Sequence, residues 1–193
     1  MNINLKINNK VIETERLILR EFTQNDLNDF NEYASVPGVG EMAGWHHHKS
    51  IEETQEILNC FIKDGQTFAI VYKKNNKVIG SIGIDQNKIN ETFKTLENYA
   101  GCTIGFVLSK DYWGKGIMPE AVKGVINYLF NDLNLDYIIC GYYTFNNQSK
   151  RVQEKCGFKP FITKESTTRM GTKELAVYNL LVNPDKNIKL INS

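Results

Sequence analysis

Residues 102–143 constrain the fold most, because two apolar strands flank a glycine-containing loop and an amphipathic helix. Cys102–Leu108 reads as one strand. Tyr137–Tyr143 reads as another, of the continuous apolar kind that is buried on both faces of a sheet. Between them, a loop at 109–116 leads to a helix that opens at Pro119-Glu120. A crossover of this kind is right-handed and makes its two strands roughly parallel. The chain is therefore expected to build a mixed sheet of the α/β class.

The remaining sequence predicts two early helices, a hairpin and a short late helix around this unit. Thr23 and Ser50 are suited to cap the early helices, because Asp26 and Glu53 follow three residues later, as in a capping box. Gly157 is expected to stop the late helix. The order predicts a single domain over residues 1–193. The expected ranges are a strand at Leu17–Arg20, a helix from Thr23 to about Ala34, a helix from Ser50 that buries Ile51, Ile57, Leu58 and Phe61, a hairpin of Thr67–Tyr72 and Val78–Ile84, a helix at Asn146–Cys156 and a strand at Leu175–Val182.

Composition narrows the class of protein. Hydrophobic residues make up 41% of the chain, charged residues 23%, and the net charge is +1, so nothing indicates the basic stripe of a nucleic-acid-binding protein. The four cysteines (Cys60, Cys102, Cys140 and Cys156) form no C-x-x-C pair for a metal or redox centre. The last three lie in apolar stretches, where a free cysteine packs as a small hydrophobe. No apolar run approaches the length of a membrane span, and the N-terminus has no apolar leader. We expect a cytoplasmic protein with no metal, no nucleic-acid partner and no membrane partner.

Gly114-Lys115-Gly116 lies between a strand and the N-terminus of a helix. Two glycines permit positive φ and let successive backbone N–H groups point to one place, and the helix adds about half a positive charge there. This geometry binds a phosphate or pyrophosphate. The loop fits neither the Walker pattern nor the dinucleotide pattern, since Pro119 stands where G-x-G-x-x-G has its third glycine. From these residues alone, a structural turn and a phosphate site remain alternatives, and Lys115 either contacts the phosphate or is solvated.

Four segments of the chain together resemble the GNAT N-acetyltransferases. The longest, IGFVLSKDYWGKGIMPEA at 104–121, is similar to the acetyl-CoA motif of that family. The others are ETERLILR at 13–20, VIGSIG at 78–83, and Asn146-x-x-Ser149 running into Lys155-Cys156-Gly157-Phe158. Their order and spacing cover nearly the whole chain. The resemblance is greatest to the branch that contains the ribosomal-protein N-terminal acetyltransferases.

The resemblance implies a GNAT-like acyl-CoA N-acyltransferase fold, a central twisted mixed sheet with helices on both faces, and acetyl-CoA as co-substrate. It implies that the strand at 104–108 splays from its neighbour and pairs with the pantetheine arm. Asn146 matches a family position near the thioester, and Ser149 matches a helix-start serine that is the general acid in some relatives. The residues implied to bind the cofactor are Phe106, Val107 and Leu108 along the pantetheine, Trp113, Gly114, Lys115, Gly116, Ile117 and Met118 at the pyrophosphate, then Asn146 and Ser149, with Arg151 (beside Lys150) proposed by its charge for the adenosine phosphate.

Three positions depart from the family pattern. Asp111 replaces the usual Gln or Arg that opens the phosphate motif. Gln153 occupies the position of the tyrosine that protonates the leaving thiolate in many members, and Thr103 stands where some relatives have a glutamate as base. Ser149 is therefore the candidate acid, and the competing interpretation is that it only caps the late helix.

His46-His47-His48 lies on the loop between the two early helices, which lines the acceptor side in this family. An imidazole with its ordinary pKa of about 6.5 is suited to take a proton from an amine. The three histidines are therefore candidates for substrate contact or the general base. The alternatives are solvated or helix-cap histidines, and a metal site, which lacks a Cys or HExxH partner.

The expected reaction is transfer of the acetyl group of acetyl-CoA to a primary amine by direct attack in a ternary complex. The acceptor is either a protein or peptide N-terminus or a small molecule such as an amino sugar or polyamine. Because Gln153 and Thr103 replace a usual acid and base, the alternative is a non-catalytic acyl-CoA-binding module. The sequence leaves a homodimer open.

Overall fold

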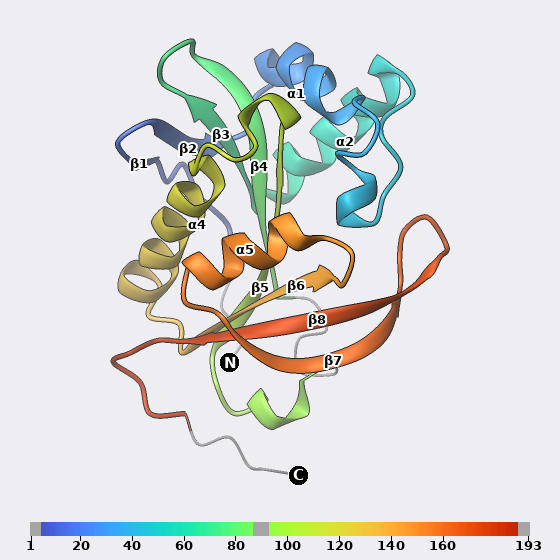
Figure 1. Ribbon diagram of the computed structural model, residues 1–193. Helices are drawn as coiled ribbons and strands as arrows, with labels where there is room; N and C mark the ends of the chain where they lie inside the picture. The colour runs from blue at the N-terminus through green and yellow to red at the C-terminus, as the bar shows by residue number, and fades with distance from the viewer. Residues whose placement is uncertain (1–4, 87–92, 189–193) are drawn as a thin grey trace.

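The computed structural model describes residues 5–86 and 93–188. Within these ranges the strands form one eight-stranded sheet in the order β1-β2-β3-β4-β5-β6-β8-β7 (Figure 1). All neighbouring pairs are antiparallel except β5 and β6, which are parallel. This confirms the mixed sheet and the parallel crossover that the sequence predicts. The strands are β1 (Ile12–Glu13), β2 (Leu17–Glu21), β3 (Thr67–Tyr72), β4 (Lys77–Asp85), β5 (Gly101–Leu108), β6 (Tyr137–Tyr143), β7 (Lys159–Thr167) and β8 (Lys173–Val182).

Helices cover both faces of the sheet (Figure 1). The helices α1 and α2 pack together over one face, and α4 and α5 lie together over the other. No helix within the described ranges is both long and apolar enough to cross a membrane. The helices are α1 (Leu27–Ala34), α2 (Ile51–Asp64), α4 (Ile117–Asn127) and α5 (Asn147–Lys155), with 3-10 turns at Gln24–Asp26, Glu41–Ala43, Lys94–Leu96 and Lys110–Tyr112 and a π-helical turn at Tyr128–Asp132 that extends α4.

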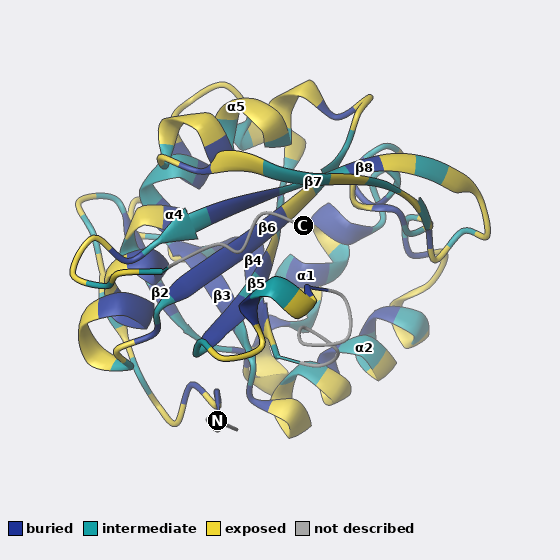
Figure 2. Cartoon of the chain, turned by 90° about the horizontal axis from the view of Figure 1, so that it is seen from below, coloured by how far each residue is buried: buried dark blue, intermediate teal, exposed yellow. Residues whose placement is uncertain are grey.

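The described residues form three apolar clusters, and Figure 2 shows the buried residues concentrated along the central strands. The largest lies between the sheet and α4, with Val122 and Leu129 fully buried. A second, around Phe30 and Leu58, joins α1 and α2 to the opposite face. The third surrounds Tyr137 under the turn at Lys94–Leu96. Cys102 and Cys140 are buried in the first cluster, as predicted, Cys156 packs against it, and all four cysteines are free.

The parallel pairing of β5 and β6 is short. It runs from Gly101 opposite Tyr137 to Ile104 opposite Cys140 and then stops, although β5 continues to Leu108 and β6 to Tyr143. The two strands therefore splay over their second halves. One expectation is corrected here: β6 is buried on both faces only over its first four residues, because the splay exposes the rest.

The helix boundaries also differ in part from the sequence prediction. The helix after the glycine loop begins at Ile117 rather than Pro119, because proline is tolerated throughout the first turn, where N–H groups have no intrahelical acceptor. The region after Thr23 starts as a 3-10 turn before α1, yet Thr23 and Asp26 form the expected capping box. Ile51 is exposed rather than part of the apolar stripe of α2, and Thr54 is buried in that helix.

Candidate active site

The loop between β5 and α4 has the conformation that its glycines predict. Gly114 and Gly116 both have a φ of +74°, and Gly116 is the N-cap of α4. The backbone N–H of Trp113 donates a hydrogen bond to the carbonyl of Lys110 at 3.1 Å. The next five backbone N–H groups, from Gly114 to Met118, donate to no acceptor in the described parts of the chain. Five free donors at the positive end of an 11-residue helix make a site for a phosphate or another anion.

Glu120, in the first turn of α4, ties this loop to the N-terminal strands. Its carboxylate accepts hydrogen bonds from Thr14 Oγ1 at 2.5 Å, from the backbone N–H of Arg16 at 2.9 Å and from Arg16 Nε at 2.6 Å. Burial opposes the charge of this carboxylate, but these three hydrogen bonds outweigh it and lower the pKa of Glu120. Arg16 Nη1 also donates to the carbonyl of Lys115 at 3.0 Å. The segment before β2 therefore holds the loop in place.

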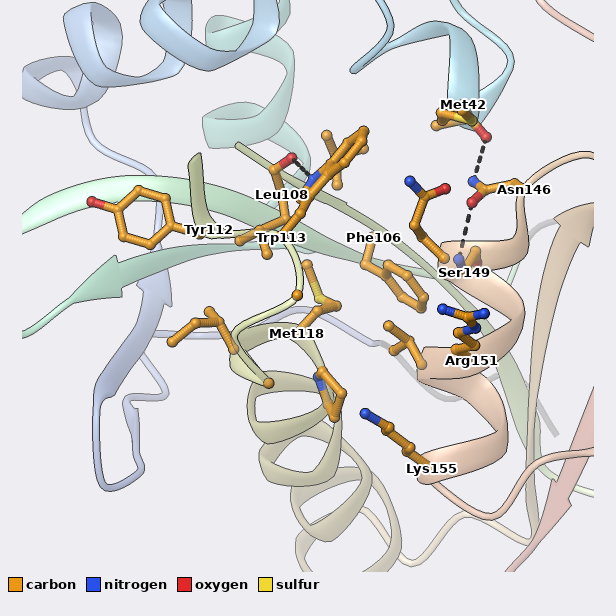
Figure 3. A pocket seen from close by; sticks show the side chains of 18 of the residues that line it. Met42, Phe106, Leu108, Tyr112, Trp113, Met118, Asn146, Ser149, Arg151 and Lys155 are labelled. Atoms are coloured by element: carbon orange, nitrogen blue, oxygen red, sulfur yellow. Dashed lines mark hydrogen bonds between the residues drawn. The ribbon is translucent and has the colours of Figure 1, made fainter. Parts of the chain in front are cut away.

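A cavity of about 300 Å³ opens beside the loop, between α4, α5 and the splayed half of β5 (Figure 3). Arg151 and Lys155 reach toward it from α5, and within the described residues they are the only charged side chains in its lining. The indole of Trp113 is fixed at its edge by a 2.8 Å hydrogen bond from Nε1 to the carbonyl of Leu108. The cavity thus combines free N–H donors and two cations at one end with an apolar wall at the other.

A second cavity of about 210 Å³ adjoins the first through the splay between β5 and β6. Residues from β6 and β8, including Tyr143 and Tyr178, line it. The side chains that line both cavities come from the turn at Glu41–Ala43, from β5 and from the start of α5: Met42, Ala43, Phe106, Asn146 and Ser149. The two cavities are therefore neighbours that share one wall, at the place where β5 and β6 splay.

Ser149 lies where the two cavities meet, and it is not the helix cap. Asn146 is the cap: its Oδ1 accepts the N–H of Ser149 at 2.9 Å, and its Nδ2 donates to the carbonyl of Met42 at 2.8 Å (Figure 3). The hydroxyl of Ser149 accepts a hydrogen bond from Nε2 of the fully buried Gln153 at 3.1 Å. Asn179 in turn donates to Oε1 of Gln153 at 2.9 Å. The interpretation of Ser149 as a cap is therefore wrong.

Most of the residues implied to bind the cofactor line the first cavity. Lys115 does not: its side chain is exposed, and its Nζ lies 5.6 Å from the centre of the Tyr112 ring. Lys150 is also outside the lining, and lies 4.0 Å from Glu154. The residues that the structure brings together in the lining are Phe106, Val107, Leu108, Trp113, Gly114, Gly116, Ile117, Met118, Asn146, Ser149 and Arg151.

The three histidines lie outside the lining of both cavities. His46 is exposed. His47 contacts Glu41, with Nδ1 2.7 Å from Oε1. His48 is buried beside Phe30, where its Nδ1 lies 2.9 Å from Thr54 Oγ1, and burial lowers its pKa. Their role as a base stays a prediction, without support from the cavity walls.

The structure adds lining residues that the sequence analysis did not single out. Met42 and Ala43 come from the short turn at Glu41–Ala43. The nearby histidines were selected from the sequence instead, because an imidazole has an evident catalytic role and these two side chains do not. Lys155 lies one helical turn beyond Arg151 on the same face of α5, and this i, i+4 spacing is the sequence signal that would have found it. Val39 and Gln148 carry no comparable signal.

These features suit an elongated anion with phosphates at one end. The free N–H groups from Gly114 to Met118 and the cations Arg151 and Lys155 suit the phosphates of acetyl-CoA. The splayed edge of β5 leaves backbone groups for the amides of a pantetheine chain. The residues present therefore fit this molecule.

Comparison with known proteins agrees with this geometry. Residues 16–159 match the family model described as Acetyltransferase (GNAT) domain. The probable N-acetyltransferase YjcK of Bacillus subtilis (strain 168) is 32% identical over 166 residues, which are 85% of this chain and 82% of YjcK.

Solved structures share the fold. An acetyltransferase (GNAT family) from Bacillus anthracis superposes with a TM-score of 0.79 at 23% identity, over 91% of this chain and all of the other. A spermidine N-acetyltransferase from Vibrio cholerae, solved in complex with CoA and spermine, has a TM-score of 0.70 at 18% identity, over 88% of this chain and 97% of the other. The chain therefore belongs to the GNAT acetyltransferase family and is an acetyl-CoA-dependent N-acetyltransferase.

Proposed function

We propose that this enzyme transfers the acetyl group to a primary amine by direct attack, in a ternary complex of protein, acetyl-CoA and acceptor. The observation that carries the proposal is the pair of adjoining cavities, with free N–H donors beside the first and Ser149 in the lining of both. When bound, acetyl-CoA supplies the acetyl group as an activated thioester. Two adjoining cavities let donor and acceptor be held together, so no acetylated enzyme is required.

The first cavity is proposed to hold the donor. The N–H groups of Gly114 to Met118 would bind the pyrophosphate, and the helix N-terminus adds favourable charge there. Arg151 and Lys155 would bind the remaining phosphate from α5, where both side chains line the cavity. Phe106, Val107 and Leu108 would line the pantetheine at the splayed half of β5.

Ser149 is proposed to be the general acid. Its Oγ already accepts a hydrogen bond from Gln153, so its own hydrogen is free to point into the cavities. The hydroxyl would donate this proton to the sulfur atom as the C–S bond breaks, and Ser149 would regain a proton through water from the nitrogen that has formed the new C–N bond. A thiol has an ordinary pKa of about 8.5, so the demand on this acid is modest. Gln153, at the position of the usual tyrosine, therefore supports an acid one turn away, and this favours an enzyme over a non-catalytic module.

The acceptor amine must also lose its proton. In the described part of the second cavity, no carboxylate or imidazole belongs to the lining. We propose that water accepts the proton, with the three histidines as the alternative that mutagenesis tests below.

The test is an initial-velocity study that follows thiol release from acetyl-CoA with a panel of amines and peptides. Intersecting double-reciprocal lines are expected for a ternary complex, whereas parallel lines would indicate an acetylated enzyme and contradict the mechanism. Release of thiol that no amine accelerates, together with tight binding of acetyl-CoA, would show a binding module instead.

A further inference from the structure

The second cavity has no charged side chain among its described lining residues. Ala176 and Tyr178 from β8 and Tyr143 from β6 form one side, and Gly105 and Phe106 from β5 form another. In the register of the sheet Tyr143 lies opposite Ala176, and Gly141 lies opposite Tyr178. These side chains therefore share one face of the sheet, and the cavity opens on that face.

Charged groups of both signs lie near this wall. Lys164 on β7 has its Nζ 5.2 Å from the centre of the Tyr178 ring. Burial is the main cause of the raised pKa of the Tyr143 phenol. The negative charge of Glu174 raises this pKa further, and the positive charge of Arg169 lowers it. Charges of both signs therefore lie near the tyrosines, and the described lining of the cavity contains no carboxylate to hold a second ammonium group.

A polyamine placed here would bring an additional positive charge to a wall that, among its described residues, offers no carboxylate as a partner. Taking an ammonium group out of water without a partner is strongly unfavourable. An uncharged apolar substituent, by contrast, gains free energy as it leaves water. The cavity therefore distinguishes between acceptors by the charge next to the reacting nitrogen.

Resting on the proposed function, we infer that the acceptor is a primary amine whose neighbouring substituent is uncharged and apolar, and that polyamines are poor acceptors. Such an amine is either a small monoamine or the N-terminus of a peptide with an uncharged first side chain. The reacting nitrogen is then the only cation that the cavity has to accommodate. An acceptor of this kind differs from spermidine, the polyamine for which the spermidine N-acetyltransferase of the same fold is named.

The test is calorimetric titration with amines that differ by one charge, on the protein with and without coenzyme A. The first pair is n-pentylamine against 1,5-diaminopentane, and the second is two pentapeptides that differ only in an alanine or a lysine at the first position. At least tenfold tighter binding of the member with one positive charge fewer, in either pair, supports the inference, and the pair that responds identifies the source. Equal or tighter binding of the doubly charged members, or binding of none, overturns it.

A substitution inside the cavity provides a matched control. Ala176→Asp adds a carboxylate to the wall and is expected to shift the preference toward 1,5-diaminopentane by tenfold or more. Leu175→Asp, one residue earlier on β8 and exposed on the other face, should leave the preference unchanged. An unchanged preference in a folded Ala176→Asp protein would contradict the inference, and if that variant does not fold, the wild-type pairs decide. A protein that binds no coenzyme A, or that binds amines but never acetylates them, would refute the proposed function and leave the amine preference as a separate result.

Discussion

Arg16 and Glu120 are 104 positions apart in the sequence, yet their side chains meet, with Arg16 Nε 2.6 Å from Glu120 Oε2. The same guanidinium group holds the carbonyl of Lys115 in the glycine loop. One ion pair thus joins the segment before β2, the first turn of α4 and the proposed pyrophosphate site. The position of the loop therefore depends on Arg16, the first residue of the family match.

Glu120→Ala should therefore reduce both stability and affinity for acetyl-CoA. The carboxylate is largely buried and accepts three hydrogen bonds, so its loss should lower the free energy of unfolding by about 2 kcal/mol. The dissociation constant for acetyl-CoA should rise about tenfold, as measured by calorimetry. The control is Glu154→Ala, which removes the exposed 4.0 Å pair with Lys150 and should change neither value appreciably. An unaltered affinity in a destabilised Glu120→Ala protein would show that the pair supports only the fold.

Gly116→Val should weaken binding far more than it weakens the fold. A Cβ at this position would meet only Arg16 Nη2, at 3.6 Å, so the protein itself has room for it. The φ of +74° still strains any other residue, at about 1–2 kcal/mol. Gly171→Val is the matched control, because its φ is +80°, it also has open space around it and it lies in the turn between β7 and β8. Both variants should lose similar stability in urea, and only Gly116→Val should lose about a hundredfold in affinity. Equal affinities would place the pyrophosphate elsewhere.

Ser149→Ala separates proton transfer from helix capping. We expect kcat to fall roughly a hundredfold, with the melting temperature and acetyl-CoA affinity nearly unchanged, because Asn146 provides the cap. Asn146→Ala should instead lower the free energy of unfolding by about 1 kcal/mol. Steady-state kinetics and thermal unfolding on both variants check this. Wild-type turnover in Ser149→Ala would leave protonation of the thiolate to water.

Single replacements of His46, His47 and His48 test the acceptor-side base. His48→Ala should destabilise the protein by about 2 kcal/mol, because the buried ring packs on Phe30 and loses its contact with Thr54. The pH profile of kcat/KM should keep its alkaline rise in all three variants if water is the base. A flattened rise in one of them alone would identify that histidine as the base.

Glu41 should make the free energy of unfolding depend on pH in the acidic range. Burial opposes its charge, but hydrogen bonds from the ring and backbone of His47 and from the backbone of Gly38 hold its pKa at about 2, below the ordinary 4.5. Its contribution is therefore fully present above pH 4.5 and lost as the pH falls toward 2. In urea unfolding, the difference between wild type and Glu41→Gln should shrink across that window. The exposed Glu56→Gln should give a small difference at every pH, and a constant difference for Glu41→Gln would contradict the assignment.

Local features of the fold were predictable because local physics determines them. The capping of α2 by Ser50, the end of α5 at Gly157 and the left-handed glycines of the loop each follow from one or two neighbouring residues. Most of the residues predicted to bind the cofactor line the first cavity, because they lie in one continuous stretch of sequence from β5 to the start of α4. Ile51 was misplaced because an apolar residue in the first turn fits the helical period while its neighbours in space leave it exposed.

The second cavity, which we propose holds the acceptor, could not be predicted in the same way. Its walls come from β5, β6, β8 and a three-residue turn, which only the tertiary fold brings together. The histidines stand out in the sequence, but His48 is held in the α1–α2 core by Phe30. Met42 carries no chemical signal, yet its carbonyl anchors Asn146. Residue type identifies chemistry more readily than it identifies location.

The short pairing of β5 with β6, which ends at Ile104, leaves an unpaired strand edge, and such an edge affects solubility. Unpaired strand edges usually lie at the rim of a sheet, where another chain can add to them and begin aggregation. Here the open edge, beyond Ile104, lies in the middle of the sheet, between α5 and the turn at Glu41–Ala43. A narrow ligand can reach it, but a strand that carries side chains and its own neighbours cannot. An added strand would have to displace α5 or this turn to pair with the edge, whereas the proposed cofactor would reach it through the first cavity.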